Sequence, residues 1–161
     1  MSVLLETSKG DIVIDLHWED CPVACKNFLK LCKMKYYNFS LFHNVQPGSH
    51  IQTGDPTGTG QGGDSLNRLL YGDQARFFED EFTRKRRHDK PGTVSMANTG
   101  PNTNASQFFI TTTEQQEHLD DKYVVFGEVA EGLDIVQQIA EAYADADGRP
   151  YQNMRIRHTI V

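Results

Sequence analysis

Residues 42–56 read FHNVQPGSHIQTGDP and residues 97–110 read ANTGPNTNASQFFI, and these two stretches decide the fold of the chain. Their apolar runs, bounded by Gly, Pro, Asn and Ser, predict short strands at 41–45, 50–52 and 108–111. Short strands separated by turn residues are typical of a barrel or a sandwich. A mainly β fold is therefore the first prediction.

A glycine-rich loop is expected from Gly54 to Gly63. Its glycines resemble a scattered phosphate-binding pattern. However, the Lys-Ser/Thr ending of a P-loop is missing, and no clear helix opens directly behind the loop. We therefore interpret the segment as a structured loop beside a groove and expect no nucleotide cofactor.

Alternating apolar and polar residues predict further strands on both sides of these stretches. Residues 3–16 read as a hairpin around the turn Ser8-Lys9-Gly10-Asp11. Short strands are predicted at 93–96 and 124–129, and a closing strand at 154–160. We expect one domain over residues 1–161, with a closed β-barrel at its centre.

Two helices are predicted to cover the ends of this barrel. Asp20 can cap, and Pro22 can open, a helix that runs to about Lys35. A second amphipathic helix is predicted at 131–143. The expected apolar faces are Ala24, Phe28, Leu31 and Cys32 in the first helix, and Leu133, Val136, Ile139, Ala140 and Tyr143 in the second. The segment 66–82 has no decisive pattern.

Composition narrows the class of protein. The chain has 161 residues, a net charge of −6 and a pI near 5.4. This acidic balance argues against direct nucleic-acid binding by the domain. No apolar run approaches the roughly 18 residues that a membrane span requires, and the start does not resemble a secretion signal. The three cysteines predict reduced thiols rather than a disulfide framework, and a metal site would need more ligands.

One basic run, Arg84-Lys85-Arg86-Arg87-His88, stands out from this acidic background. Acidic residues on both sides nearly cancel its charge, so we interpret it as a solvated surface loop. A role in nuclear localisation or RNA contact is the alternative.

No nucleophilic or metal chemistry is indicated elsewhere. Ser106 is outside any G-x-S-x-G elbow, and the histidines lack metal-ligand spacing. The two opening stretches instead resemble the active-site signature of the cyclophilins, which are peptidyl-prolyl cis-trans isomerases. The resemblance extends over nearly the whole chain, from Gly10-Asp11-Ile12 to Val125-Phe126-Gly127. It implies an eight-stranded antiparallel barrel capped by two helices, with a groove that holds an Xaa-Pro peptide.

The reaction that this resemblance implies is a bond rotation. Amide resonance sets a barrier of about 18–20 kcal/mol, and the prolyl nitrogen becomes pyramidal and basic in the twisted transition state. A hydrogen-bond donor aimed at that nitrogen stabilises the transition state more than the ground state. The reaction needs no metal or cofactor, so we expect none.

Part of the family's groove is retained. By resemblance, Gln52 and the Asn98 backbone would hydrogen-bond the substrate chain. Phe109 would form the floor of the proline pocket and Leu119 one wall, with Ala97 beside them. The remaining groove positions are His43 and Thr99.

Other groove positions depart from the family pattern. Asn44 stands where the family has its catalytic arginine. Ser49 and His50 replace a Phe-Met pair, and Tyr123 replaces a histidine. His118 stands where many members have a tryptophan associated with cyclosporin binding. Loss of one preorganised donor costs about 2.7–4 kcal/mol, so the sequence predicts weak isomerase activity.

The chain resembles most closely the isomerase-like 4 branch, whose members continue into an RNA-recognition motif. That resemblance implies an intracellular, reducing location, nuclear or cytoplasmic, with the nucleus favoured. We expect a monomer that meets a proline-containing peptide or protein. Two functions stay open: a slow isomerase, or a catalytically silent scaffold in nuclear RNA-processing (spliceosomal) assemblies.

Overall fold

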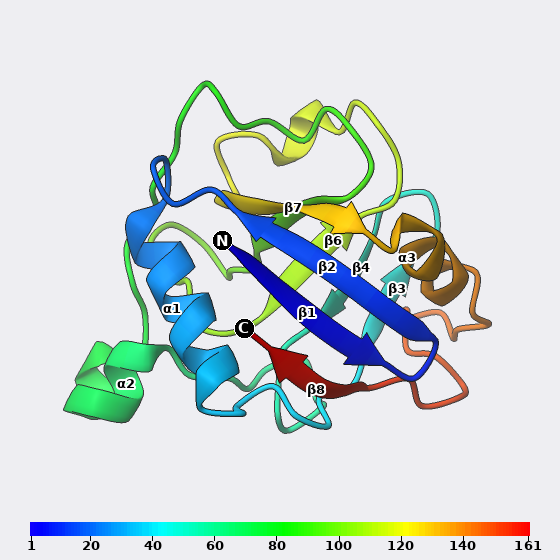
Figure 1. Ribbon diagram of the computed structural model, residues 1–161, viewed down its shortest axis with the longest axis horizontal. Coiled ribbons are helices and arrows are strands. Elements are labelled where there is room, and N and C mark those ends of the chain that lie inside the picture. The colour runs from blue at the N-terminus through cyan, green and yellow to red at the C-terminus, as the bar shows by residue number, and fades with distance from the viewer.

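Eight antiparallel strands form one curved sheet in the computed structural model, which describes residues 1–161 (Figure 1). Along the sheet their order is β3-β4-β6-β5-β7-β2-β1-β8. The strands are β1 Ser2–Thr7, β2 Gly10–Leu16, β3 Asn44–Gln46, β4 His50–Thr53, β5 Thr93–Met96, β6 Phe108–Thr111, β7 Val125–Glu131 and β8 Ile156–Ile160. The predicted mainly β fold, the hairpin and the strands at 93–96 and 108–111 are confirmed.

The predicted closure of the barrel is only partly right. No ladder joins β3 to β8, so the regular sheet is open at that seam. The segments before these two strands meet instead through an isolated bridge between Leu41 and Arg155. The Phe42 N–H also donates to the Met154 carbonyl at 2.8 Å. The seam is therefore held by single contacts rather than by continuous pairing.

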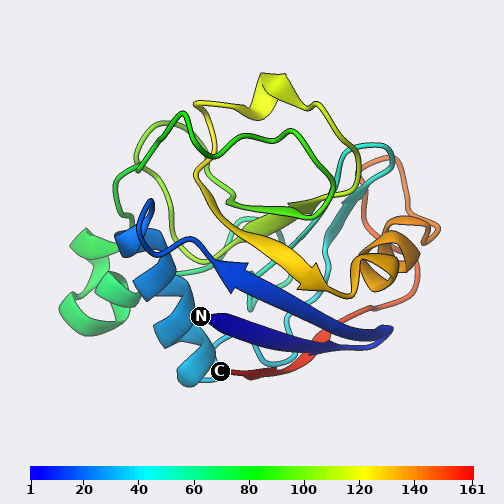
Figure 2. The same cartoon turned by 45° about the horizontal axis from the view of Figure 1, so that its top comes forward.

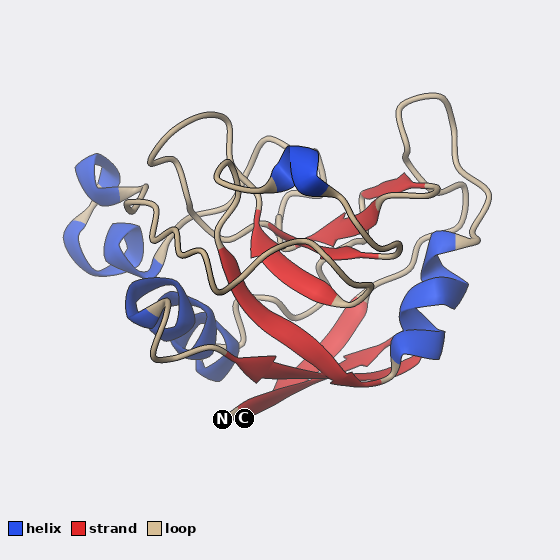
Figure 3. Ribbon diagram, turned by 90° about the horizontal axis from the view of Figure 1, so that it is seen from above, coloured by secondary structure: helices blue, strands red, loops and turns tan.

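Helices α1 (Pro22–Lys33) and α3 (Leu133–Ala140) flank the sheet at opposite sides (Figure 2), as predicted. Figure 3 shows the strands curving between them, with the two termini side by side. The undecided segment forms a short helix, α2 (Leu66–Tyr71), and a 3-10 turn, η1 (Asp73–Ala75). A second 3-10 turn, η2, covers Glu117–Leu119.

The start of α1 differs from the prediction. Asp20 does not cap the helix, because its carboxylate pairs with Arg86 at 2.8 Å. Glu81, distant in sequence, caps it instead. Its two carboxylate oxygens accept from the Val23 N–H at 3.0 Å and the Ala24 N–H at 2.8 Å. A carboxylate satisfies two free amides there and interacts favourably with the helix dipole.

The end of α3 also differs. The helix stops at Ala140, so Tyr143 lies beyond it and is 88% exposed. Leu133, in its first turn, is also exposed. Val136 and Ile139 alone are fully buried along this helix. The predicted apolar face is therefore right at its centre and too long at both ends.

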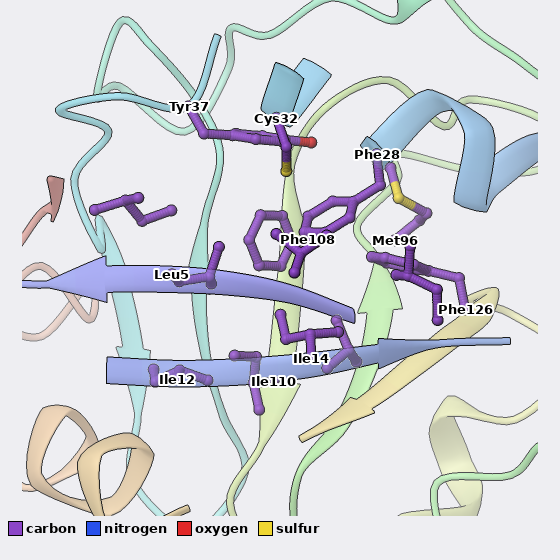
Figure 4. Packing of buried hydrophobic residues seen from close by; sticks show 14 of the residues in the cluster. Leu5, Ile12, Ile14, Phe28, Cys32, Tyr37, Met96, Phe108, Ile110 and Phe126 are labelled. Atoms are coloured by element: carbon purple, nitrogen blue, oxygen red, sulfur yellow. The ribbon is translucent and has the colours of Figure 1, made fainter. Parts of the chain in front are cut away.

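Aromatic rings from α1 and the sheet form the centre of the core (Figure 4). The Phe28 ring lies 5.2 Å from Phe108 and 5.1 Å from Phe126, centroid to centroid. Tyr37 completes the group at 5.5 Å from Phe28. Because side chains alternate across a strand, burial of Phe108 in this core places Phe109 on the opposite face of β6.

The glycine-rich loop folds around the carboxylate of Asp55, a residue of the loop itself. The fully buried Asp55 carboxylate accepts hydrogen bonds from the backbone of Thr57, Gly60 and Gly62 at 2.8–3.0 Å. Burial alone would raise the pKa of Asp55, but these bonds and that from the Thr57 hydroxyl outweigh it and hold the pKa below its usual value. Amides that could hold a phosphate are thus already used by Asp55.

Candidate active site

Three neighbouring strands bring Asn44, Gln52 and Phe109 into one row. Asn44 of β3 lies opposite Gln52 of β4, and Gln52 lies opposite Phe109 of β6. Residues directly opposite in antiparallel strands point to the same face. Three residues predicted for the groove therefore share one surface, although the longest gap between them in sequence spans the whole glycine-rich loop and β5.

Amide side chains connect this row to the glycine-rich loop. Gln107 gives its Nε2 hydrogens to the Gly60 and Gly62 carbonyls, at 3.0 and 2.9 Å. Its Oε1 is therefore the acceptor for Gln52 Nε2, at 2.9 Å. The loop carbonyls thereby fix the orientation of the Gln52 amide.

The same donor-to-acceptor direction of the amide hydrogen bonds continues to Asn44. Gln52 Oε1 is left to accept from Asn44 Nδ2, at a long 3.5 Å, and Asn44 Oδ1 accepts from Gln46 Nε2 at 2.7 Å. Asn44 thus keeps its Nδ2 as donor on the Gln52 side, with a second Nδ2 hydrogen unused within the chain. That hydrogen is neutral, whereas the arginine of the family pattern carries a full charge.

Phe109, predicted to be the floor of the proline pocket, has only 3% of its surface exposed. Three rings surround it: His50 at 5.0 Å, Tyr123 edge-on at 5.2 Å, and His88 stacked at 5.9 Å. Leu119 of η2 is also buried. Two of the three aromatic neighbours of this apolar ring are therefore imidazoles.

Three hydrogen-bonded side chains, Ser95, His88 and Asp120, lie beside Phe109. Ser95 of β5 lies opposite Phe109, and its Oγ is 2.7 Å from His88 Nε2. His88 Nδ1 is 2.7 Å from Asp120 Oδ1. Asp120 only accepts, so Nδ1 carries the hydrogen and Nε2 accepts from Ser95. Burial lowers the pKa of His88, and the hydrogen bond to Asp120 opposes that shift.

This Ser-His-Asp order is that of a hydrolase triad, but its geometry excludes that chemistry. Ser95 is fully buried within the sheet, so no substrate carbonyl can reach its hydroxyl. The hydrogen bonds of Ser95 and Asp120 instead hold the His88 ring where it stacks on Phe109. No three His, Cys, Asp or Glu side chains are grouped so as to hold a metal ion.

Two hollows flank Asn98 beside this row. One, of about 140 Å³, is lined by Gln52, Ala97, Asn98, Thr99 and Gln107, among others. The second, of about 490 Å³, is lined by Asn98, Thr99 and Tyr123 among others. The Asn98 side chain is held by the Lys122 carbonyl at 2.7 Å and by the Gly100 N–H at 3.2 Å. The backbone N–H and C=O of Asn98 make no hydrogen bond within the protein.

Not every predicted groove residue reaches the row. His43 is buried beneath the loop, near Gly60, and both its ring nitrogens lack a partner in the protein. His118 is exposed on η2. Ser49 contacts the row only through His50, since its Oγ lies 2.8 Å from His50 Nδ1.

Two residues that position the site were missed in the sequence. Gln107 begins the line of hydrogen-bonded amides that continues through Gln52 and Asn44 to Gln46, here called the amide row. Its place two residues before Phe109, next to β6, was an available signal. His88 was interpreted only as part of the basic run. Nothing in its local pattern indicates that it stacks on Phe109.

Fold and site together define a cyclophilin. The family model described as "Cyclophilin type peptidyl-prolyl cis-trans isomerase/CLD" matches residues 2–161, and the chain belongs to that family. It is similar to a crystal structure of a Cryptosporidium parvum cyclophilin-type isomerase obtained in the presence of the dipeptide Ala-Pro. That similarity has a TM-score of 0.92 and 36% identity, and covers 100% of this chain and 98% of the other.

More similar sequences come from longer proteins. The chain is 59% identical to the peptidyl-prolyl cis-trans isomerase CYP59 of Arabidopsis thaliana and 58% identical to the human peptidyl-prolyl cis-trans isomerase-like 4. Both matches cover 100% of this chain, but 32% and 33% of those proteins. The chain therefore spans about a third of the length of these relatives. None of its helices is long and apolar enough to cross a membrane.

Proposed function

We propose that this domain binds Xaa-Pro peptides in the groove beside Gln52, Asn98 and Phe109 and isomerises them slowly. The observation that carries the proposal is the amide row, which leaves Asn44 Nδ2 as a neutral donor in line with the Phe109 floor. The Ala-Pro dipeptide named for the Cryptosporidium parvum structure supports the choice of ligand.

The proposed mechanism uses few groups. The proline ring lies on Phe109, and the peptide backbone is held by Gln52 and by the Asn98 backbone. As the preceding carbonyl rotates, Asn44 donates to the pyramidal prolyl nitrogen. A neutral hydrogen bond is roughly half as strong as a charge-assisted one. Loss of one preorganised donor lowers a rate by about 100- to 1000-fold, and we place this domain in that range.

Exchange NMR on a short Xaa-Pro peptide tests the proposal. Exchange cross-peaks between cis and trans signals are expected at catalytic protein concentration, with peptide-induced shifts at Phe109 and Gln52. Gln52→Ala should slow the exchange about 2- to 13-fold, because one hydrogen bond contributes about 0.5–1.5 kcal/mol. Gln138→Ala, an exposed glutamine on α3, is the matched control and should leave exchange unchanged.

A second candidate is a silent scaffold in nuclear RNA-processing assemblies. Its support is that Asn44 is engaged on two sides by Gln46 and Gln52 and carries no charge. The resemblance to proteins with an RNA-recognition motif is the reason for proposing a nuclear setting. Peptide-induced shifts without any exchange would favour this function. If the peptide causes no shifts and no exchange is seen, both candidate functions are refuted.

A further inference from the structure

We infer that His50 supplies the cationic donor that Asn44 lacks, by donating from protonated Nε2 to the prolyl nitrogen in the twisted transition state. The inference rests on the proposed isomerase function and deepens it. It assigns to His50 a role different from that of a pocket wall. It also predicts that the isomerisation rate rises as the pH falls.

The position of His50 fits this role. It begins β4 two residues before Gln52, so the two side chains lie on the same strand face. Its ring centroid is 5.0 Å from that of Phe109, which is the proposed seat of the proline ring. A proline on Phe109 would therefore lie against this imidazole.

Hydrogen bonds around Gln116 determine which ring nitrogen is free. Gln116 Nε2 donates to the carbonyls of Ser49 and Thr113, at 2.8 and 3.3 Å, so its Oε1 must be the acceptor. Ser49 Oγ donates to that Oε1 at 2.9 Å. The only hydroxyl hydrogen of Ser49 is thereby used.

It follows that His50 Nδ1 must donate to Ser49 Oγ, at 2.8 Å. Nδ1 carries a hydrogen in the neutral ring and in the cation alike, so protonation changes only Nε2. Nε2 makes no direct hydrogen bond within the chain and is not among the buried unpaired atoms, so it reaches the surface, with the Gln52 side chain beside it.

The two states of Nε2 have opposite effects on the reaction. In neutral His50 it presents a lone pair, which repels the lone pair that develops on the prolyl nitrogen. In the cation it presents a charged N–H, and a donor aimed at developing charge is worth most in a partly desolvated site. Protonation thus converts an opposing group into a catalytic one.

The groups that face His50 set the direction of the pH dependence. Burial lowers its pKa from 6.5, the neighbouring Gln52 side chain opposes this, and a charge on His118 would lower the pKa further. His88 and Tyr123 contact the same Phe109 ring from other sides, and Asp120 holds His88. With a pKa at or below 6.5, the protonated fraction rises about tenfold or more between pH 7.5 and 5.5.

The test is exchange NMR at pH 7.5 and 5.5, using a blocked Ala-Pro peptide without titratable side chains. Wild-type protein should accelerate exchange about tenfold or more at the lower pH. His50→Gln keeps a neutral polar group and should lose the rise. His158→Gln, an exposed histidine on β8, should keep it. Ring ¹⁵N shifts should show neutral His50 with its hydrogen on Nδ1.

Each outcome separates this inference from the function on which it rests. Exchange with no pH dependence, or a rise that persists in His50→Gln, would overturn the role of His50 and leave a slow isomerase. A neutral ring with its hydrogen on Nε2 would overturn it without any variant. Peptide-induced shifts with no exchange at either pH would overturn the role of His50 and leave a binding module.

Discussion

Replacement of Asp55 by asparagine tests whether a buried carboxylate holds the glycine-rich loop. The two side chains have nearly the same shape, so the change removes the charge and one acceptor oxygen. If the amide oxygen keeps the contacts with Thr57, the new NH₂ group faces the Gly60 and Gly62 N–H groups, at 2.8 and 3.0 Å from the present oxygen. Two donors are then left without an acceptor.

The expected loss is large for such a small change. A hydrogen bond to a charged group contributes about 1.5–3 kcal/mol, so loss of two should lower the free energy of unfolding by about 3 kcal/mol or more. Urea denaturation followed by the fluorescence of Trp18, the single tryptophan, measures this. Asp147→Asn is the control, because that exposed carboxylate makes no ion pair.

The pH dependence has a definite sign. The folded-state pKa of Asp55 is lowered below 3.8, so its contribution is complete above pH 3.8 and is lost as the pH falls through the folded pKa. The gap between wild type and variant should therefore narrow in acid. A variant within about 0.5 kcal/mol of wild type at pH 7 would refute the view that Asp55 organises the loop.

Four further outcomes are expected. Asn44→Arg alone should not restore full activity in exchange NMR, because His50 has replaced an apolar wall; full rescue would contradict this. Ser95→Ala should lower the free energy of unfolding by about 1–3 kcal/mol in urea, since it leaves buried His88 Nε2 without a partner. Cyclosporin should bind weakly in calorimetry, given His118 at the family's tryptophan position; a nanomolar complex would count against this. The three cysteines, buried and with pKa values raised by burial to about 12, should not react with a thiol reagent in native protein.

Local pattern was sufficient for much of the fold. The strands at 93–96 and 108–111 follow from their apolar runs, and the burial of Phe28 and Cys32 follows from the predicted apolar face of the first helix. The cap of α1 could not be predicted in this way, because Glu81 reaches the helix from a distant loop. α2 escaped prediction because it is short and leaves Leu70 and Tyr71 exposed.

The site shows the same division between local and distant contacts. Resemblance located Asn44, Gln52 and Phe109, which lie in register as a groove requires. It could not indicate that His88 stacks on Phe109, because that contact depends on the path of the long loop before β5. Nor could it indicate the proton positions around His50, which depend on an amide in a different loop.

The glycine-rich loop also fixes which end of each amide in the row is the donor. Each amide in the row can turn end for end with little change in shape, and only the Gly60 and Gly62 carbonyls distinguish the two arrangements. If the loop moved away, that preference would disappear and Asn44 could present oxygen instead of nitrogen to a peptide. The backbone of a distant loop therefore decides whether the groove offers a donor or an acceptor. Drift of the loop would leave the groove free to adopt either polarity without moving any strand.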